Sequence, residues 1–163
     1  MKMEIVEISQ VNDCLAEMVA LFRVELRSYK GIVSKTNIEA GREEMEEYLA
    51  AGFPVFAAIM DGEYAGYVVC RVDSQVVWVE SIFVKEEYRH HGVATALHSK
   101  AEEIAATYGE DTVYNYVHPN NHRMIAFLRK RGYTVLNLIE IRKPYEGENL
   151  TQRITVGEHE FDY

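Results

Sequence analysis

The spacing of apolar residues near the N-terminus predicts a short strand followed by two amphipathic helices. The strand is expected at about residues 3–8. Apolar residues then recur every three or four positions over residues 11–26, and a second helix with an acidic outer face is expected over residues 38–51. The side chains expected to pack inward from these helices are Val11, Leu15, Met18, Val19, Phe22, Leu26, Met45, Tyr48 and Leu49.

The middle of the chain changes to short apolar segments that are typical of strands. The segments "PVFAAIM", "YAGYVVCRV" and "VVWVESIFV" follow one another with Asp61-Gly62 and Asp73-Ser74 between them. Such pairs between apolar segments are typical of tight turns. We therefore predict three successive antiparallel strands.

From Gly92 the apolar period becomes helical, and Gly109 is placed to end this helix. A strand in "TVYNYVH" follows, so residues 76–118 read as a strand–helix–strand crossover that sets two parallel strands in a mixed sheet. We further expect a helix in "NHRMIAFLRKR" stopped by Gly132, a strand in "YTVLNLIEIRK" and a last antiparallel strand in "QRITVGEHEFDY". The predicted fold class is α/β, with a mixed, mostly antiparallel sheet flanked by helices.

Composition and charge narrow the class of protein. With 163 residues, 48% of them hydrophobic, the chain fits one globular domain, residues 1–163. A formal net charge of −9 argues against a nucleic-acid partner, because binding to phosphate backbones depends on a surplus of Lys and Arg. An acidic surface attracts cations and amines, although acidity can also simply keep a protein in solution.

The N-terminus and the cysteines indicate a soluble protein in a reducing compartment. The segment "MKMEIVEISQ" lacks the apolar run of a signal peptide, and no apolar stretch approaches the ~20 residues that cross a bilayer. Cys14 and Cys70 have neither metal-ligand nor redox spacing. We expect a cytoplasmic protein with no membrane partner.

The segment "VKEEYRHHGVATAL" joins the third of these strands to the following helix and is the strongest candidate for a binding site. The first N–H groups of a helix lack partners within the helix and carry partial positive charge, so they bind phosphate where the backbone is accessible. Gly92 and Ala94 leave the backbone accessible, and Arg89 adds a fixed positive charge. The alternative is that Gly92 only turns the chain into the helix. The sequence contains neither G-x-x-x-x-G-K-[ST] nor G-x-G-x-x-G, so two other phosphate-binding motifs are excluded.

Two motifs in register resemble the GNAT superfamily of acyl-CoA-dependent N-acyltransferases. The segment "IFVKEEYRHHGVATAL" fits the family pattern of a strand ending in Val, an Arg or Gln five residues later, then x-x-G-x-G/A and a helix. The segment "NHRMIAFLRKRGY" resembles the family's later Asn-led helix, which is closed by a Gly and an aromatic residue. The resemblance covers nearly the whole chain. It implies a GNAT-like acetyltransferase fold, acetyl-CoA as cosubstrate, an amine acceptor and the homodimer that is common in this family.

The resemblance also implies where acetyl-CoA binds. Its pantetheine arm would pair like an added strand with the backbone of Ile82, Phe83 and Val84, and Asn121 would contact it near the sulfur. Arg89 would add its charge near the phosphates. The pyrophosphate would lie on the backbone amides of His90, His91, Gly92, Val93, Ala94 and Thr95.

Glu80 is the candidate catalytic base. Strict alternation places it on one face of its strand with Val76, Trp78, Ile82 and Val84, and burial in this apolar row would make the carboxylate a stronger base. Members of the resembled family that acetylate polyamines and aminoglycosides carry a Glu four residues before the motif Val. The alternative is a carboxylate on a partly solvated strand, or one paired with an Arg.

The sequence leaves three candidates for the group that protonates the leaving thiolate. The resembled family commonly carries a Tyr seven residues after the helix Asn, and here that position is Leu128. Tyr116 is the first choice as a substitute acid, Tyr133 is the second, and water is the third. Many family members that act on protein N-termini carry a Glu where Tyr116 stands, so its absence argues modestly against that acceptor class.

These features together predict an N-acetyltransferase, an enzyme that moves an acetyl group from acetyl-CoA to a primary amine of a small molecule or protein by direct attack. The alternative is a non-catalytic module that senses acyl-CoA. No tight ligand set emerges from His90, His91, His98 and His118, so no metal is expected.

Overall fold

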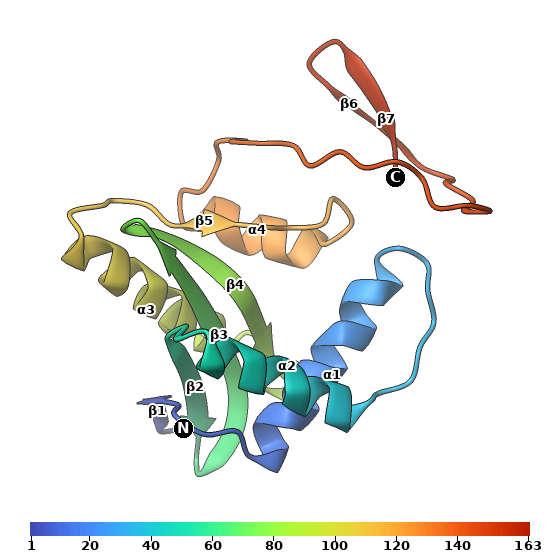
Figure 1. Ribbon diagram of the computed structural model, residues 1–163. Helices are drawn as coiled ribbons and strands as arrows, with labels where there is room; N and C mark the ends of the chain where they lie inside the picture. The colour runs from blue at the N-terminus through green and yellow to red at the C-terminus, as the bar shows by residue number, and fades with distance from the viewer. The chain divides into compact units, whose positions relative to one another are not determined.

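Residues 1–163 are described by a computed structural model, in which the chain forms two units, residues 1–118 and 119–163 (Figure 1). The first unit contains a five-stranded sheet in the order β1-β2-β3-β4-β5. Neighbouring strands are antiparallel from β1 to β4, whereas β5 runs parallel to β4, which confirms the predicted mixed sheet. The strands are β1 Met3–Glu7, β2 Val55–Met60, β3 Glu63–Asp73, β4 Val76–Val84 and β5 Tyr114–Asn115.

Two helices, α1 Asp13–Ser28 and α2 Ile38–Ala50, pack on one face of the sheet, and their bounds agree with the apolar periodicity to within two residues. Each begins at an Asn whose side chain accepts a hydrogen bond from a first-turn N–H. Asn12 accepts from Leu15 at 2.9 Å, and Asn37 accepts from Ala40 at 3.1 Å. The core under these helices consists of Leu15, Met18, Val19, Met45, Val55, Ala57, Tyr67, Val69 and Phe83.

The third helix, α3 Val93–Thr107, covers the opposite face of the sheet. Tyr67 packs in the core under α1 and α2, so its neighbour Gly66 points to the other face. A Cβ on Gly66 would lie 3.2 Å from Leu97 Cδ1 of α3. Gly109 follows the helix in the left-handed conformation, with φ +77°, as the sequence predicts for its end. No helix is both long and apolar enough to span a membrane.

The close approach of α1 and α2 depends on Gly41. A Cβ at this position would lie 2.3 Å from the carbonyl oxygen of Ala16 and 2.9 Å from the backbone nitrogen of Ala20. Hydrogen is therefore the only side chain that fits without moving the helices apart. The ion pair between Arg23 and Glu44 also joins the two helices.

The second unit contains α4 His122–Lys130 and a hairpin of β6 Arg153–Val156 and β7 His159–Asp162. Gly132 follows α4 with φ +90°, in agreement with its predicted role at the helix end.

Two predictions for the second unit are wrong. Residues 133–143 form no strand, because alternating apolar residues give a segment β propensity but do not supply the neighbour that a strand must pair with. The tail forms two strands where one was expected. Gly157, with φ +61°, turns the chain so that Val156 pairs with His159.

Candidate active site

One edge of β4 is open. β5 pairs with β4 only at Trp78 and Val79, so no strand pairs with that edge over residues 80–84. β5 is shorter than the strand predicted over residues 112–118. Backbone groups at a free strand edge can pair with an extended ligand. The predicted pantetheine-binding stretch, residues 82–84, thus lies where such pairing is possible.

The loop between β4 and α3 enters the helix through two left-handed residues. A 3₁₀ turn at Glu86–Tyr88 is followed by His90 with φ +64° and Gly92 with φ +81°. No atom lies within 4 Å of the position that a Cβ on Gly92 would take, so backbone conformation rather than packing requires this glycine. No side chain caps the first turn of α3, over residues 93–95. The geometry supports the turn role of Gly92, and it also leaves helix N–H groups available for an anion.

Arg89 holds this loop against the rest of the unit. Its Nε donates to the carbonyl oxygen of Val84 at 2.9 Å, and its Nη2 donates to Glu25 of α1 at 3.1 Å. Its guanidinium also lies 5.7 Å from the centre of the Phe83 ring. The charge expected to face phosphate is thus engaged with a carboxylate, and a direct contact of Arg89 with the cosubstrate remains a prediction. His90 and His91 are exposed.

A β-bulge at Glu80 decides which side chains lie together. Ser81 is opposite Val69 while Val79 is opposite Cys70, so Glu80 is the extra residue of β4. Glu80 therefore lies on the face covered by α1 and α2, beside Ser81, whose hydroxyl is 2.9 Å from that of the buried Tyr67.

Because of the β-bulge, the predicted apolar row around Glu80 is wrong for Ile82 and Val84. Ile82 is opposite Val68 and Val84 is opposite Gly66, on the face that α3 covers. They do not share the face of Glu80, because an inserted residue reverses the alternation beyond it. The side chain of Glu80 is 28% exposed and paired with Arg71, so the alternative of a carboxylate held by an Arg describes this structure.

Arg71 contacts three side chains in this cluster. Its Nε donates to Glu80 Oε2 at 3.1 Å, and its Nη2 lies 3.4 Å from the hydroxyl of Tyr116. The guanidinium carbon lies 4.3 Å from the ring centre of Trp78, whose ring in turn contacts Tyr114 at 5.6 Å between centroids. Glu80 Oε1 accepts no hydrogen bond within the chain and is free for a ligand.

A second Arg–Glu pair lies on the same face of the sheet, between α1 and α2. Arg23 Nε donates to Glu44 Oε2, and the Tyr48 hydroxyl donates to Glu44 Oε1 at 2.7 Å. Burial, and then the hydrogen bond to Glu44, raise the pKa of Tyr48, with a smaller contribution from the charge of Glu80. Burial also raises the pKa of Tyr67. Both phenols therefore remain protonated at neutral pH.

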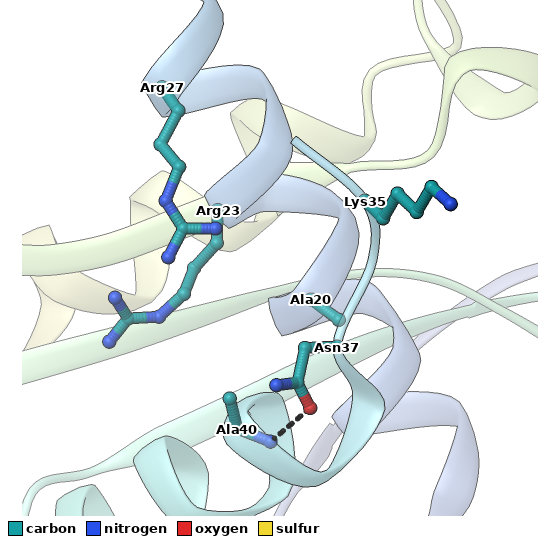
Figure 2. A pocket seen from close by; sticks show the side chains of 6 residues that line it. All are labelled: Ala20, Arg23, Arg27, Lys35, Asn37 and Ala40. Carbon is teal, nitrogen blue, oxygen red and sulfur yellow. Dashed lines mark hydrogen bonds between the residues drawn. The ribbon is translucent and has the colours of Figure 1, made fainter. Parts of the chain in front are cut away.

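A pocket of about 170 Å³ lies between α1, α2 and the segment that joins them (Figure 2). Figure 2 shows Arg23 and Arg27 extending from α1 toward the same side, while the amine of Lys35 points away from both guanidinium groups. Guanidinium groups are suited to binding carboxylate or phosphate. The other residues that line the pocket are Ala20, Asn37 and Ala40.

The remaining candidates have other surroundings within their own units. Tyr116 is 64% exposed and joins the cluster only through Arg71. Asn121 belongs to the second unit, where its Oδ1 accepts a hydrogen bond from the backbone of Met124 at 3.1 Å and caps α4. Leu128 lies on the same helix and is buried.

The histidines and cysteines are not gathered into a reactive group. No set of three His, Cys, Asp or Glu side chains is placed to hold a metal ion. His98 is buried, with its ring nitrogens 3.0 Å from Asn115 Oδ1 and 3.1 Å from Glu102 Oε1, so it ties α3 to β5. Burial raises the pKa of the Cys70 thiol to about 12, which makes it a poor nucleophile.

The sequence analysis leaves open an Arg partner for Glu80 but does not identify Arg71. A charged side chain two positions after Val69 and four after Tyr67 falls on the core-facing side. A cation at an inward position of a strand signals a buried partner. That signal could have found the Arg71–Glu80 pair.

The chain is similar to known proteins in both sequence and fold. Residues 18–133 match the model of the acetyltransferase (GNAT) family. A similar curated protein is the N-alpha-acetyltransferase of Saccharolobus solfataricus, 28% identical over 111 residues, which are 60% of this chain and 65% of that protein. The chain thus matches slightly less than two thirds of that relative's length.

Solved structures share the fold. Aminoglycoside N-acetyltransferase AAC(6')-Iy in complex with CoA superposes with a TM-score of 0.65 at 24% identity, over 87% of this chain and 95% of that one. The PaiA N-acetyltransferase of Thermoplasma acidophilum in complex with coenzyme A has a TM-score of 0.65 at 20% identity, over 80% of this chain and 89% of that one. With the family match over most of its length, the chain belongs to the acetyltransferase (GNAT) family.

Proposed function

We propose that this protein is an N-acetyltransferase that moves an acetyl group from acetyl-CoA to a primary amine by direct attack. The observation that carries the proposal is the placement of Glu80, a carboxylate with one free oxygen, on a β-bulge next to the open edge of β4. A base beside the edge expected to hold the thioester is what amine acetylation requires. The names of the similar proteins, acetyltransferases with CoA bound in two cases, support this chemistry.

The cosubstrate would bind along β4 and at the start of α3. The backbone of residues 82–84 would pair with the pantetheine arm, and the N–H groups of residues 90–95 would bind the pyrophosphate. Asn121 would contact the cosubstrate near its sulfur. The uncapped first turn of α3 and the unpaired edge of β4 support these assignments.

In the proposed reaction, Glu80 Oε1 accepts a proton from the ammonium form of the acceptor, and the neutral nitrogen then attacks the thioester carbon. The nitrogen releases its second proton to water as it becomes the amide. The new C–N bond forms, the C–S bond breaks, and the electron pair leaves with the sulfur as CoA thiolate. A proton from Tyr116 or from water completes CoA. The raised pKa of Cys70 supports direct attack, since a protonated thiol is a poor acyl carrier.

The acceptor is a primary amine of a small molecule or of a protein. The similar archaeal protein is an N-alpha-acetyltransferase, which favours a protein N-terminus, whereas Tyr116 stands where many such enzymes carry a Glu. The charge of Arg23 is paired with Glu44, so Arg27 is the pocket residue that favours an acceptor that also carries a carboxylate or phosphate.

The test is release of free thiol from acetyl-CoA in the presence of an amine panel of polyamines, aminoglycosides, amino acids and short peptides, with acetylated product identified by mass spectrometry. We expect thiol release that depends on both acetyl-CoA and one class of amine. Tight acetyl-CoA binding without thiol release from any amine would instead support the acyl-CoA sensor.

A further inference from the structure

Arg71 is the group most directly placed to control Glu80. It enters from β3, opposite Trp78 of β4, so the sheet register fixes its stem. Its guanidinium lies between the Trp78 ring, the carboxylate of Glu80 and the hydroxyl of Tyr116. The Arg71 and Glu80 side chains are equally exposed, at 28%, so water screens their interaction only partly.

We propose that Arg71 is a positioning residue for the acetyl-transfer reaction, which holds the carboxylate of Glu80 so that its free oxygen is presented to the acceptor amine. This inference rests on the proposed function. The hydrogen bond from Arg71 Nε occupies Oε2, so Oε1 is the oxygen that remains to accept a proton. A guanidinium is charged at every working pH, so the carboxylate keeps its partner throughout the catalytic range.

The β-bulge and the Trp78 ring together fix the guanidinium of Arg71 beside the carboxylate of Glu80. The bulge sets Glu80 on the face that carries Arg71, and the cation–π contact with Trp78 keeps the guanidinium from swinging into solvent. Without the cation, a partly buried carboxylate favours its protonated form, in which it cannot act as a base. Arg71 would thus extend the activity of the enzyme toward acidic pH.

The other titratable groups on this face are neutral in the acid range or are paired with other residues. Tyr48 of α2 and Tyr67 of β3 have raised pKa values, so they stay neutral across the acid range. Glu44 already has Arg23 and Tyr48 as partners. Tyr116 contacts Arg71 rather than Glu80. Arg71 is therefore the cation whose removal most directly affects the ionisation of Glu80.

The experiment is the pH profile of kcat/KM for wild type, Arg71→Met and Arg71→Lys with one amine. The amine titrates identically in every assay. Differences between the pH profiles of the variants therefore arise from the protein. Removal of a neighbouring cation makes a carboxylate harder to ionise. We expect the acid limb to move up by about one pH unit or more in Arg71→Met and to stay near its original position in Arg71→Lys.

Arg42→Met is the matched control, because it removes an Arg of similar exposure whose carboxylate partner, Asp13, lies outside this face. Its profile should match wild type. If Arg71→Met does not fold, Arg71→Gln keeps a hydrogen-bond donor without the charge and should show the same shift.

If wild type is active and the acid limb does not move in Arg71→Met or Arg71→Gln, the proposed role of Arg71 is wrong. The proposed function would not be affected by that result. Wild type that releases no thiol with any amine would overturn both.

Discussion

At the scale of single residues, one inserted position determines which side chains meet at the candidate site. Alternation along β4 predicts Glu80 in an apolar row, but the bulge moves Ile82 to the opposite face and leaves Glu80 beside Arg71. The identity of the candidate base could be read from the sequence. For its partner, the sequence contains only the inward position of Arg71 as a signal, and the contact itself depends on the register between β3 and β4.

The residue that protonates the thiolate is tested by exchanging hydroxyl groups. If Tyr116 donates this proton, Tyr116→Phe should lower kcat by about 10²-fold or more, since a positioned acid contributes 10² to 10⁴ in rate. Steady-state rates with the identified amine measure this effect. Tyr145→Phe is a control that removes an exposed phenol from the second unit.

Leu128→Tyr restores the hydroxyl that the family commonly carries. If Tyr116→Phe keeps full turnover while Leu128→Tyr raises it, water protonates the thiolate in the natural protein. Because Leu128 is buried, the folding of this variant must be checked by thermal unfolding.

At the scale of elements, the apolar pattern was a good guide to the helices and to strands β1 to β4, but not to the segment after α4. The bounds of α1 and α2 followed from apolar spacing, because a helix satisfies its own hydrogen bonds. Residues 133–143 are rich in Val, Leu and Ile yet form no strand, since a strand depends on a partner that the local sequence does not encode.

The contact between α1 and α2 is tested by Gly41→Ala. Alanine favours helices by about 1 kcal/mol over glycine, but the added methyl would overlap the backbone of Ala16. Overpacking costs about 1 to 3 kcal/mol, so we expect a net loss of stability in urea unfolding. Glu43→Ala, on the exposed side of the same helix, should change stability by less than about 0.5 kcal/mol. Unchanged or increased stability of Gly41→Ala would contradict this account of the contact.

The loop before α3 is tested by Gly92→Glu, which places a carboxylate beside the uncapped N–H groups of the helix. We expect acetyl-CoA binding, measured by calorimetry, to be lost through repulsion of the pyrophosphate. Gly92→Asn should retain part of the binding, because Asn tolerates the left-handed conformation and is neutral.

Gly109→Glu controls for backbone strain, because Gly109 has the same left-handed conformation at the other end of α3. It should weaken folding while leaving the affinity for acetyl-CoA unchanged. Equal affinities for Gly92→Glu and wild type would mean that Gly92 serves only the turn.

At the scale of the whole molecule, the family match explains why two short motifs were sufficient to predict the fold. The motifs at residues 82–97 and 121–133 lie within the matched region, residues 18–133. The structure adds what the motifs do not contain, namely the Arg71–Glu80 and Arg23–Glu44 pairs and the pocket beside Arg23.

The measurement that tests the central claim most directly is the rate of acetyl transfer by Glu80→Gln beside wild type, with the identified amine and across pH. The Gln side chain keeps the shape of Glu but cannot accept the proton. We expect kcat/KM to fall ~10²-fold or more at neutral pH, with the remaining rate rising at higher pH as the free amine becomes available. Glu103→Gln, which removes an exposed carboxylate paired with Lys100 on α3, should leave the rate unchanged. A Glu80→Gln protein with wild-type turnover at every pH would contradict the account.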